Sequence, residues 1–432
     1  MQNASWRNRL VFPYSKSVME KFSEAKRALE ILGIKHEIVA DNVVVKYGET
    51  LLVNLGLDKD KDLGEQVSKM IDFLKDKDEA VLNLVNQVSK FEIKDKAGDF
   101  VGSRMGRPEK AKLRKLIGSP NVLFPIGEQG GRFRSVGAAV EAEFIKADFP
   151  NYFCEKCEKE TIYNKCEDCG GVPKLTKICP VCSKKTDEDI CDCRGEEGVN
   201  TRKYSFRKID SKHYFKKSLE HLGIERREVP ELIKGIKRTS STDRDFENLA
   251  KGILRSKYNV HVNKDGTIRY DATEMPVSHF YPSEIGISVD KLQEQGYVKD
   301  INGKELVSEN QLLELKPHDI ILPSCPDTKD ERADDLFANI ANFVDELLEK
   351  FYKLPRHYNI KSREDLVGQL VVCMAPHNCA GVIGRIIGFS KNQGLMASPF
   401  IHAAMRRDCD GDEAAVMLLM DVLINFSRKF LP

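Results

Sequence analysis

Residues 402–424 read HAAMRRDCDGDEAAVMLLMDVLI, and three aspartates at alternate positions, Asp408, Asp410 and Asp412, stand in the middle of this stretch. In an extended or looped segment, alternate side chains point to the same side, so the three carboxylates can converge. Gly411 lets the backbone bend between them without steric penalty. Mg²⁺ takes oxygen ligands and is usually held by one or two carboxylates together with phosphates. The stretch therefore predicts a magnesium site, and the alternatives are a solvated acidic turn or a calcium loop.

The residues around this stretch favour a metal site over a surface turn. A calcium loop of the EF-hand type ends on a bidentate glutamate, but no acidic residue follows Glu413 before Asp421. The run from 414 to 424 is apolar except for Asp421, and a helix that is apolar nearly all round is a buried helix. Three cationic or titratable residues precede the aspartates, namely His402, Arg406 and Arg407. We therefore expect the carboxylates to lie between cations and a buried helix.

Several long stretches resemble one protein family. The segments 366–394, LVGQLVVCMAPHNCAGVIGRIIGFSKNQG, and 400–432, FIHAAMRRDCDGDEAAVMLLMDVLINFSRKFLP, resemble the catalytic region of the large subunit of archaeal family D DNA polymerase. MGRPEKAKLRK at 105–115 and NVLFPIGEQGG at 121–131 resemble earlier parts of the same family. The resemblance covers at least residues 100–432 and follows the family's order.

The resemblance implies a fold and an activity. The family's core consists of two double-psi β-barrels, as in multisubunit RNA polymerases, so we expect an α+β multidomain chain. The implied activity is template-dependent nucleotidyl transfer by a DNA-directed DNA polymerase of DNA replication, with two Mg²⁺ ions. By motif match, Asp410 and Asp412 would bind these ions. Asp408 stands where the family usually has Asn, which makes it a candidate third catalytic residue. The family's holoenzyme also has 3′–5′ exonuclease activity, which we expect on the small subunit.

Length and composition predict several domains. The chain has 432 residues, 41% of them hydrophobic, and single hydrophobic cores stop growing at roughly 250–300 residues. The formal net charge of +1 means that nucleic-acid contacts must come from local clusters. We expect an N-terminal α/β domain with a charged helix (1–90), a first barrel segment (91–150), a zinc-binding module (151–200), a basic DNA-contacting segment completing the first barrel region (201–330), and a helix with the second barrel and the catalytic aspartates (331–432).

Hydrophobic periodicity predicts the local structure of some segments. Helical spacing indicates a helix at 16–32, ended by Gly33, and strands follow around a turn at Asp41 and Asn42. Residues 58–79 are typical of an exposed, charge-laced helix. The remaining predicted elements are a helix at 331–354, ended by Pro355, and buried strands at 366–374 and 382–389.

Eight of the twelve cysteines follow the spacing of zinc knuckles. Two C-x-x-C pairs can complete the sulfur tetrahedron of a structural Zn²⁺, and such a closed site has no catalytic position. We expect one zinc ion in each of two quartets, Cys154, Cys157, Cys166 and Cys169, and Cys179, Cys182, Cys191 and Cys193. An iron–sulfur cluster, a redox pair and swapped pairing between the quartets are the alternatives. The other cysteines, Cys325, Cys373, Cys379 and Cys409, are expected to be small buried hydrophobes.

Two segments are rich in cations. Residues 104–115 hold six Lys and Arg beside the single acid Glu109, and residues 202–238 hold twelve Lys and Arg against five Asp and Glu, interleaved with aromatic residues. Such clusters suit phosphates, and rings can stack on bases. The alternatives are a solubilising helix and aromatic core residues. With the resemblance, the candidates for phosphate or DNA contact are Lys110, Lys112, Lys115, Arg385, Arg406, Arg407, His377 and His402.

The resemblance also implies partners. These are primer–template DNA, deoxynucleoside triphosphates, a small exonuclease subunit and a sliding clamp. Because family members extend further at both ends, the chain resembles a fragment or one half of a split gene, and we expect a companion polypeptide to supply the C-terminal part. No run of about 18 apolar residues occurs, so we expect a cytoplasmic protein without a membrane partner. The alternative functions are an RNA-synthesising relative with the same barrels and an inactive zinc-bearing DNA-binding fragment.

Overall fold

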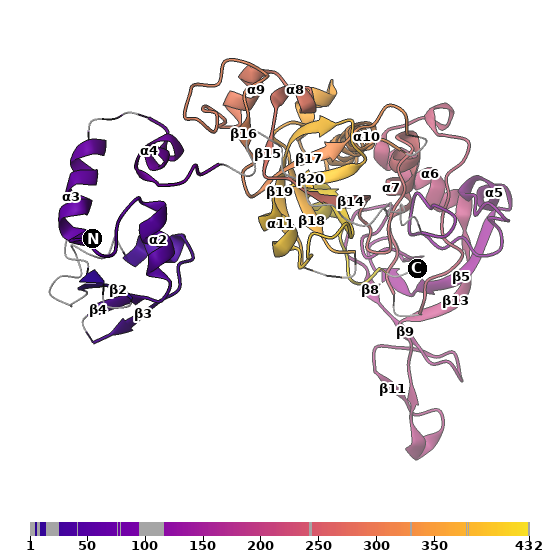
Figure 1. The fold of residues 1–432 in the computed structure, drawn as a ribbon. Helices are drawn as coiled ribbons and strands as arrows, with labels where there is room; N and C mark the ends of the chain where they lie inside the picture. The colour runs from indigo at the N-terminus through magenta and orange to yellow at the C-terminus, as the bar shows by residue number, and fades with distance from the viewer. Residues whose placement is uncertain are drawn as a thin grey trace. The chain divides into compact units, whose positions relative to one another are not determined.

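The computed structural model describes residues 5–6, 9–13, 26–40, 42–75, 77, 79–94, 116–241, 244–328, 331–376, 378 and 380–430. The chain divides into two compact units, residues 1–100 and residues 101–432 (Figure 1). Within the described parts, no helix has the length and apolar character needed to cross a membrane.

The first unit is a small α/β structure. Its antiparallel sheet has the order β1-β2-β4-β3, and β3 and β4 pair in an antiparallel hairpin. Of the two residues expected to form a turn, Asn42 is the first residue of β4, and Asp41 lies outside the described residues. Gly33 has a positive φ of 65°, so it ends the described part of the preceding helix as predicted. The charged helix is α3, which is shorter than the predicted range of 58–79 and is capped by Asp62 through the amide of Glu65 at 2.7 Å. The elements of this unit are β1 (Ser5–Trp6), β2 (Leu10–Pro13), β3 (His36–Val39), β4 (Asn42–Val45), α2 (Gly48–Asn54), α3 (Leu63–Leu74) and α4 (Val81–Val88).

The second unit begins with a long two-stranded sheet covered by helices. β5 pairs with β13 over its whole length, and Asp210 at the end of β13 caps α6 by accepting the amide of His213 at 3.0 Å. Gly223 ends α6 in the left-handed conformation. The elements of this part are α5 (Val136–Glu141), β5 (Phe144–Pro150), β13 (Tyr204–Asp210), α6 (Ser211–Leu222), a 3₁₀ turn (Arg226–Glu228) and α7 (Leu249–Lys257).

Short strands carry the cysteines between β5 and β13. β6 pairs with β7 and β8 in a three-stranded sheet, and two two-stranded ribbons follow, β9 with β10 and β11 with β12. Figure 1 shows the segment around β11 extending away from the β5–β13 sheet. These elements are β6 (Tyr152–Cys154), β7 (Lys159–Thr161), β8 (Lys174–Leu175), β9 (Lys177–Ile178), β10 (Lys185–Thr186), β11 (Ile190–Cys191), a 3₁₀ turn (Gly195–Glu197) and β12 (Val199–Asn200).

A closed barrel of six strands forms the centre of the C-terminal half. Its order is β14-β20-β17-β19-β18-β21, with parallel pairs β14–β20 and β17–β19 and antiparallel pairs elsewhere. Nearly all the inward-facing positions are apolar, and the largest buried cluster of the unit runs from this barrel to α6, α7 and α10. The strands are β14 (Tyr270–Pro276), β17 (Asp319–Pro323), β18 (Leu370–Met374), β19 (Val382–Ser390), β20 (Gly394–Ala397) and β21 (Glu413–Leu418).

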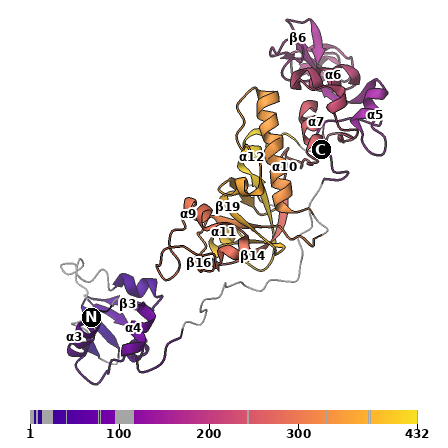
Figure 2. The same ribbon diagram turned by 90° about the horizontal axis from the view of Figure 1, so that it is seen from above.

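Helices and short loops surround the barrel. α10 is the long helix predicted at 331–354; it ends earlier, at Glu346, and a π-helical turn continues to Tyr352. Figure 2 shows α10 alongside α12, and the two helices are in contact. The elements are β15 (His279–Phe280), α8 (Pro282–Ile285), α9 (Val289–Glu294), β16 (Leu313–Glu314), α10 (Ala333–Glu346), the π-helical turn (Leu347–Tyr352), a 3₁₀ turn (Arg363–Leu366), α11 (Pro399–Ala404) and α12 (Leu419–Asn425).

Two sequence-based expectations about this half differ from the structure. The apolar run 414–424 is not one buried helix: β21 occupies its first part, the backbone at Leu418 is extended, and α12 follows. The expected assignment of 201–330 to a separate first barrel also differs, because β14 and β17 close the same barrel as the strands from 370 to 418. The part of the chain that the structure describes contains one closed barrel. Composition indicates which segments form strands, but the tertiary fold determines which strands pair with one another.

Candidate functional site

The acidic stretch forms a tight loop between α11 and β21. One carboxylate oxygen from each of Asp408, Asp410 and Asp412 lies within 4.8 Å of the other two. The residues between them have positive φ angles, 60° at Cys409 and 95° at Gly411. A non-glycine residue is uncommon in this region, so the loop is held in its curved form by its surroundings. The convergence predicted from the alternating spacing is present.

Glu274, on β14, anchors this loop from below. Its Oε1 atom accepts the amide of Asp410 at 3.1 Å and the amide of Asp412 at 3.4 Å, and its own amide donates to the Asp412 carbonyl at 2.9 Å. β14 and β21 are neighbours in the barrel, with Thr273 opposite Glu413, so strand pairing brings Glu274 to the loop. Glu274 is absent from the residues predicted from sequence. A single glutamate in a strand-like stretch has no local pattern that marks it.

Burial and hydrogen bonding act in opposite directions on Glu274. Its Oε2 atom lies 3.3 Å from Nδ1 of His402, and both side chains are fully buried. Burial alone would raise the pKa of the Glu274 carboxyl, but His402 and the two loop amides outweigh this effect and leave that pKa below its ordinary value. The carboxylate form of Glu274 is therefore the form that fits the loop. His402 is a buried partner of Glu274 and has no surface with which to contact a phosphate.

The two arginines before the loop point to different environments. Arg407 lies half-buried in the site, where its Nη1 atom is 3.1 Å from Oδ2 of Asp412 and its Nη2 atom donates to the carbonyl of Glu413 at 2.8 Å. Arg406 is exposed and has a φ of 63°, which turns the chain out of α11. Arg407 therefore neutralises part of the charge of the loop, while Arg406 faces solvent.

The other predicted phosphate contacts have different outcomes. Arg385 forms a two-pronged ion pair with the buried Asp319, through Nε at 2.8 Å and Nη2 at 2.8 Å, so its charge is already matched inside the protein. The guanidinium of Arg385 is therefore held by Asp319 and not by the acidic loop. Lys110, Lys112, Lys115 and His377 lie outside the described residues.

The donor set of the loop fits a hard divalent cation. Three carboxylates offer oxygen ligands on one side, and the aspartate side chains are only partly buried, so waters and phosphate oxygens can complete the shell. Arg407 offsets part of the charge of the three carboxylates through its ion pair with Asp412. Asp408, Asp410 and Asp412 are the residues that would hold Mg²⁺.

The structure brings the cysteines together in the two quartets that chain order suggests, without swapping. Within the first, Cys154 and Cys169 have sulfur atoms 3.5 Å apart, and Cys157 and Cys166 are 3.9 Å apart. In the second, the pairs Cys179–Cys193 and Cys182–Cys191 both have sulfur atoms 3.6 Å apart. A tetrahedron with Zn–S bonds of about 2.3 Å has edges of about 3.8 Å. Both quartets therefore have the size of a four-sulfur zinc site.

Backbone amides favour a thiolate in each quartet. The amide of Gly171 is the main cause that lowers the pKa of Cys169 to about 7, and the amide of Cys182 is the main cause that lowers the pKa of Cys179 to about 6. Metal ligation requires deprotonated sulfur, so these amides prepare the quartets for a cation. Of the remaining cysteines, Cys373 is fully buried as expected, and burial raises its pKa to about 12. Cys325 and Cys409 are partly exposed, and Cys379 lies outside the described residues.

The two quartets differ in how they join the rest of the unit. Ile162 and Tyr163, between the halves of the first quartet, belong to the main buried cluster. Asp168 and Glu167 contact α6 through Lys217 at 3.0 Å and His213 at 3.2 Å. The second quartet lies on the outlying ribbons, and Cys182 and Cys193 are exposed. The segment of the first quartet is therefore packed into the core of the second unit, whereas the second quartet lies in a peripheral segment.

The basic segment 202–238 forms β13, α6 and the chain that follows. Tyr214 and Phe215 are buried core residues on α6, which is the alternative considered for the aromatics. Phe206 is 71% exposed on β13, and Lys208 of the same strand lies over the ring of Phe144 at 4.3 Å. Only part of this segment is therefore free to meet a ligand.

Comparison with known proteins identifies similar sequences along nearly the whole chain. The family model "DNA polymerase II large subunit DP2, central domain" matches residues 4–188, and "DNA polymerase II large subunit DP2, catalytic domain" matches residues 225–432. The DNA polymerase II large subunit of Nanoarchaeum equitans is 42% identical over 450 residues, covering 96% of this chain and 35% of the relative.

Two further relatives carry the same name. The protein of Archaeoglobus fulgidus is 42% identical over 431 residues, covering 98% of this chain and 35% of the relative. That of Pyrococcus furiosus is 40% identical over 424 residues, covering 96% of this chain and 32% of the relative. The chain thus spans about a third of the length of the curated relatives it matches.

Proposed function

Because the chain belongs to the family of DNA polymerase II large subunits, we propose that it supplies the catalytic carboxylates of a DNA-directed DNA polymerase acting in DNA replication. The observation that carries the proposal is the convergence of Asp408, Asp410 and Asp412 on a loop fixed by a buried glutamate. Carboxylates in this arrangement are what phosphoryl transfer with divalent ions requires. The template-directed product would be a DNA strand lengthened at its 3′ end.

The proposed reaction joins the 3′-oxygen of a primer to the α-phosphorus of a deoxynucleoside triphosphate. The new P–O bond forms as the bond to the β-phosphate oxygen breaks, so pyrophosphate leaves and the hydroxyl proton passes to solvent. Two Mg²⁺ ions, when bound, would stabilise the attacking and leaving oxygens. Asp410 and Asp412 hold the metal position, and Asp408 is a candidate third ligand. Arg407 limits the charge on Asp412, and exposed Arg406 would contact a phosphate.

Further parts of the proposal concern partners and structural metal. Each cysteine quartet holds one structural Zn²⁺, supported by its sulfur spacing. A small subunit would carry the 3′–5′ exonuclease activity, and a companion polypeptide and a sliding clamp would complete the complex. Lys110, Lys112, Lys115 and His377 remain proposed contacts to the triphosphate or primer end.

Substitution of the loop aspartates tests the proposal. Asp410→Asn or Asp412→Asn should reduce primer extension by the reconstituted complex at least about 10³-fold while the affinity for primer–template stays within twofold, since the charge needed for the metal is lost and the fold is kept. Asp290→Asn, on the exposed face of α9, is the matched control. Undiminished synthesis by either loop variant would refute the metal assignment. Incorporation of ribonucleotides in place of deoxynucleotides would instead favour the RNA-synthesising alternative.

A further inference from the structure

A pocket of about 720 Å³ lies in the second unit, and none of its lining residues belongs to the acidic loop. Its wall is formed by ten described residues from separate parts of the chain. Five are cations, four are apolar and one is an amide, and none is acidic. They are Arg134, Lys237, Arg238, Lys264 and Arg269, with Leu116, Ile117, Ile236, Pro376 and Asn263.

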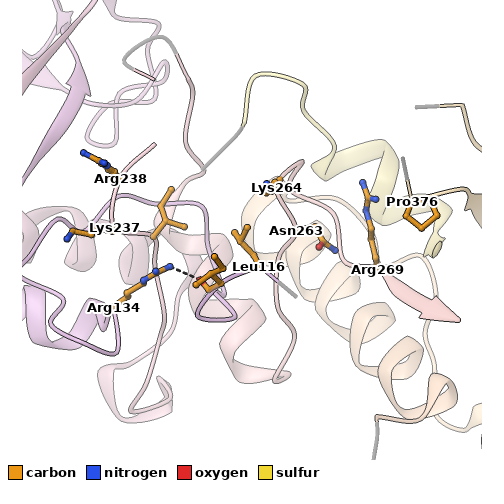
Figure 3. Close-up of a pocket in the computed structure, with 10 residues that line it drawn as sticks. Leu116, Arg134, Lys237, Arg238, Asn263, Lys264, Arg269 and Pro376 are labelled. Atoms are coloured by element: carbon orange, nitrogen blue, oxygen red, sulfur yellow. Dashed lines mark hydrogen bonds between the residues drawn. The ribbon is translucent and has the colours of Figure 1, made fainter. Parts of the chain in front are cut away.

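The cations lie on two sides of the pocket. Figure 3 shows Arg134, Lys237 and Arg238 on one side and Lys264 and Arg269 on the other. Ile236 and Leu116 belong to a small apolar cluster that is separate from the main buried cluster. The pocket therefore has an apolar floor between two groups of positive charge.

The internal partners of these cations leave much of the charge unmatched. Arg269 is paired with Asp265, and Lys237 lies 2.7 Å from the exposed Glu128. Arg134 donates to the carbonyl of Ile117 at 2.6 Å, which fixes its position without cancelling its charge. Arg238 and Lys264 are exposed, and neither has an ion pair within the described residues. Arg134, Arg238 and Lys264 keep charges that no described acid matches, so the pocket is favourable for an anion that neutralises several of its cations together.

Strand pairing relates this pocket to the acidic loop. Pro376 lies two residues after the end of β18, and Met374 of β18 pairs with Ala415 of β21. β21 begins at Glu413, immediately after the acidic loop. One edge of the pocket, at Pro376, is therefore at the barrel end that carries the candidate metal ligands.

We propose that this pocket binds the phosphodiester backbone of the primer–template, with consecutive phosphates between the two groups of cations. The inference rests on the proposed polymerase function and names the substrate part that the pocket holds. A nucleoside triphosphate has the same phosphate chemistry. The backbone is favoured because the cations come from three separate chain segments on both sides of the cavity, and the apolar floor offers contact to sugars.

The test measures the affinity of the 432-residue chain for a fluorescent primer–template by anisotropy over a range of salt concentrations. The triple variant Lys237→Gln, Arg238→Gln and Lys264→Gln removes three cations of the pocket, none of which has an ion pair with a buried acid among the described residues. Each lost phosphate contact lowers the slope of log Kd against log salt by about 0.9. We expect a Kd at least tenfold higher near 0.1 M salt and a slope smaller by about 2 to 3.

A matched triple variant separates local from overall charge. Lys291→Gln, Lys299→Gln and Lys304→Gln removes the same charge from residues on and after α9, and its Kd should stay within twofold of the original. Equal weakening by both triples would overturn the proposal. So would a pocket variant that binds DNA normally but loses affinity for deoxynucleoside triphosphate in a titration without DNA. Charge reversal at one position, Lys264→Glu, should weaken DNA binding in the same direction.

The outcome is independent of the aspartate test. Asp410→Asn should lose extension but keep the original Kd and salt slope, whereas the pocket triple should raise the Kd and lower the salt slope. An active Asp410→Asn variant would refute the metal site and leave the pocket result standing. Normal salt dependence in the pocket triple would refute the pocket and leave the metal site standing.

Discussion

Glu274 accepts the backbone amide of Asp410 at 3.1 Å across 136 positions of sequence. The same oxygen also accepts the amide of Asp412, so one buried side chain fixes the backbone on both sides of Gly411. The loop carries a non-glycine residue, Cys409, at a φ of 60°, which costs conformational energy and needs such support. Glu274 is therefore a positioning residue for the candidate metal ligands.

Replacing Glu274 should raise the magnesium requirement of the proposed activity. In Glu274→Ala, two amides lose their acceptor, and a buried donor without a partner costs about 1–3 kcal/mol. We expect the Mg²⁺ concentration for half-maximal primer extension to rise at least about tenfold, because the carboxylates are no longer held together. Glu274→Gln keeps an acceptor oxygen and should lie between Ala and the original. A purely structural role would lower activity at all Mg²⁺ concentrations equally, which would contradict this prediction.

Removing Arg385 should destabilise the barrel without affecting DNA contacts. Asp319 is fully buried and receives Arg385 as well as the hydroxyl of Tyr297 at 2.6 Å. Arg385→Met would leave this carboxylate without its cation, at a cost of about 3–5 kcal/mol in the free energy of unfolding. The double variant Arg385→Met with Asp319→Leu should recover most of that loss. Chemical denaturation measures the free energy of unfolding of both variants. A changed salt slope of DNA binding in Arg385→Met would mean that Arg385 contacts a phosphate.

Sequence patterns predicted the features whose parts lie close together in the chain. The loop aspartates are two positions apart, and each cysteine quartet consists of two pairs with one or two residues between their members, so local geometry alone brings their ligands together. Glu274 and the Asp319–Arg385 pair could not be found in this way. Arg385 and Asp319 are register partners on parallel strands β17 and β19, and only the barrel topology makes them neighbours.

The apolar run before α12 illustrates a second limit. A continuous apolar stretch is compatible with a buried strand or a buried helix, and periodicity cannot separate the two. β21 has β14 and β18 on its two sides and is buried almost throughout, so its sequence lacks the alternation that marks a half-exposed strand. Strand pairing in the closed barrel therefore determines that the chain is a strand up to Leu418 and a helix after it.

The two cysteine quartets should respond differently to loss of metal. Cys157→Ser removes a ligand from the first quartet, and the residues between the two halves of that quartet belong to the main buried cluster. Loss of a structural metal is among the changes that lower stability most. We expect the free energy of unfolding of the second unit to fall by at least about 3 kcal/mol. Cys182→Ser should free only the outlying ribbons and leave global stability within about 0.5 kcal/mol.

Metal analysis and hydrogen exchange check this difference. Each variant should lose one zinc equivalent, and faster exchange should spread to α6 in Cys157→Ser but stay within residues 177–200 in Cys182→Ser. Cys325→Ser, outside both quartets, is the control. Full zinc content in either quartet variant would contradict the assignment of that quartet as a zinc site.

A buried carboxylate at the start of α12 should give stability a distinct pH dependence. Asp421 has no exposed surface, and burial raises its pKa from 3.8 to about 6, although Arg255, Lys251, the amide of Ile268 and the side chain of Asn425 act in the opposite direction. Around it, Lys251 donates to Asn425 at 2.7 Å, and Arg255 is paired with Glu247 at 2.7 Å. The folded state therefore favours the protonated carboxyl more than the unfolded state does.

The sign of the effect follows from proton linkage. Between pH 4 and pH 6 the folded chain binds more protons at Asp421 than the unfolded chain, so this group's contribution is largest below pH 4 and is lost as the pH rises through about 6. Compared with Asp421→Asn, the original chain should lose about 2 kcal/mol of relative stability between pH 4 and pH 7. Paired denaturation curves at several pH values measure the difference, with exposed Asp192→Asn as control. A stability difference that is constant with pH would mean that Asp421 is ionised throughout, balanced by Arg255 and Lys251.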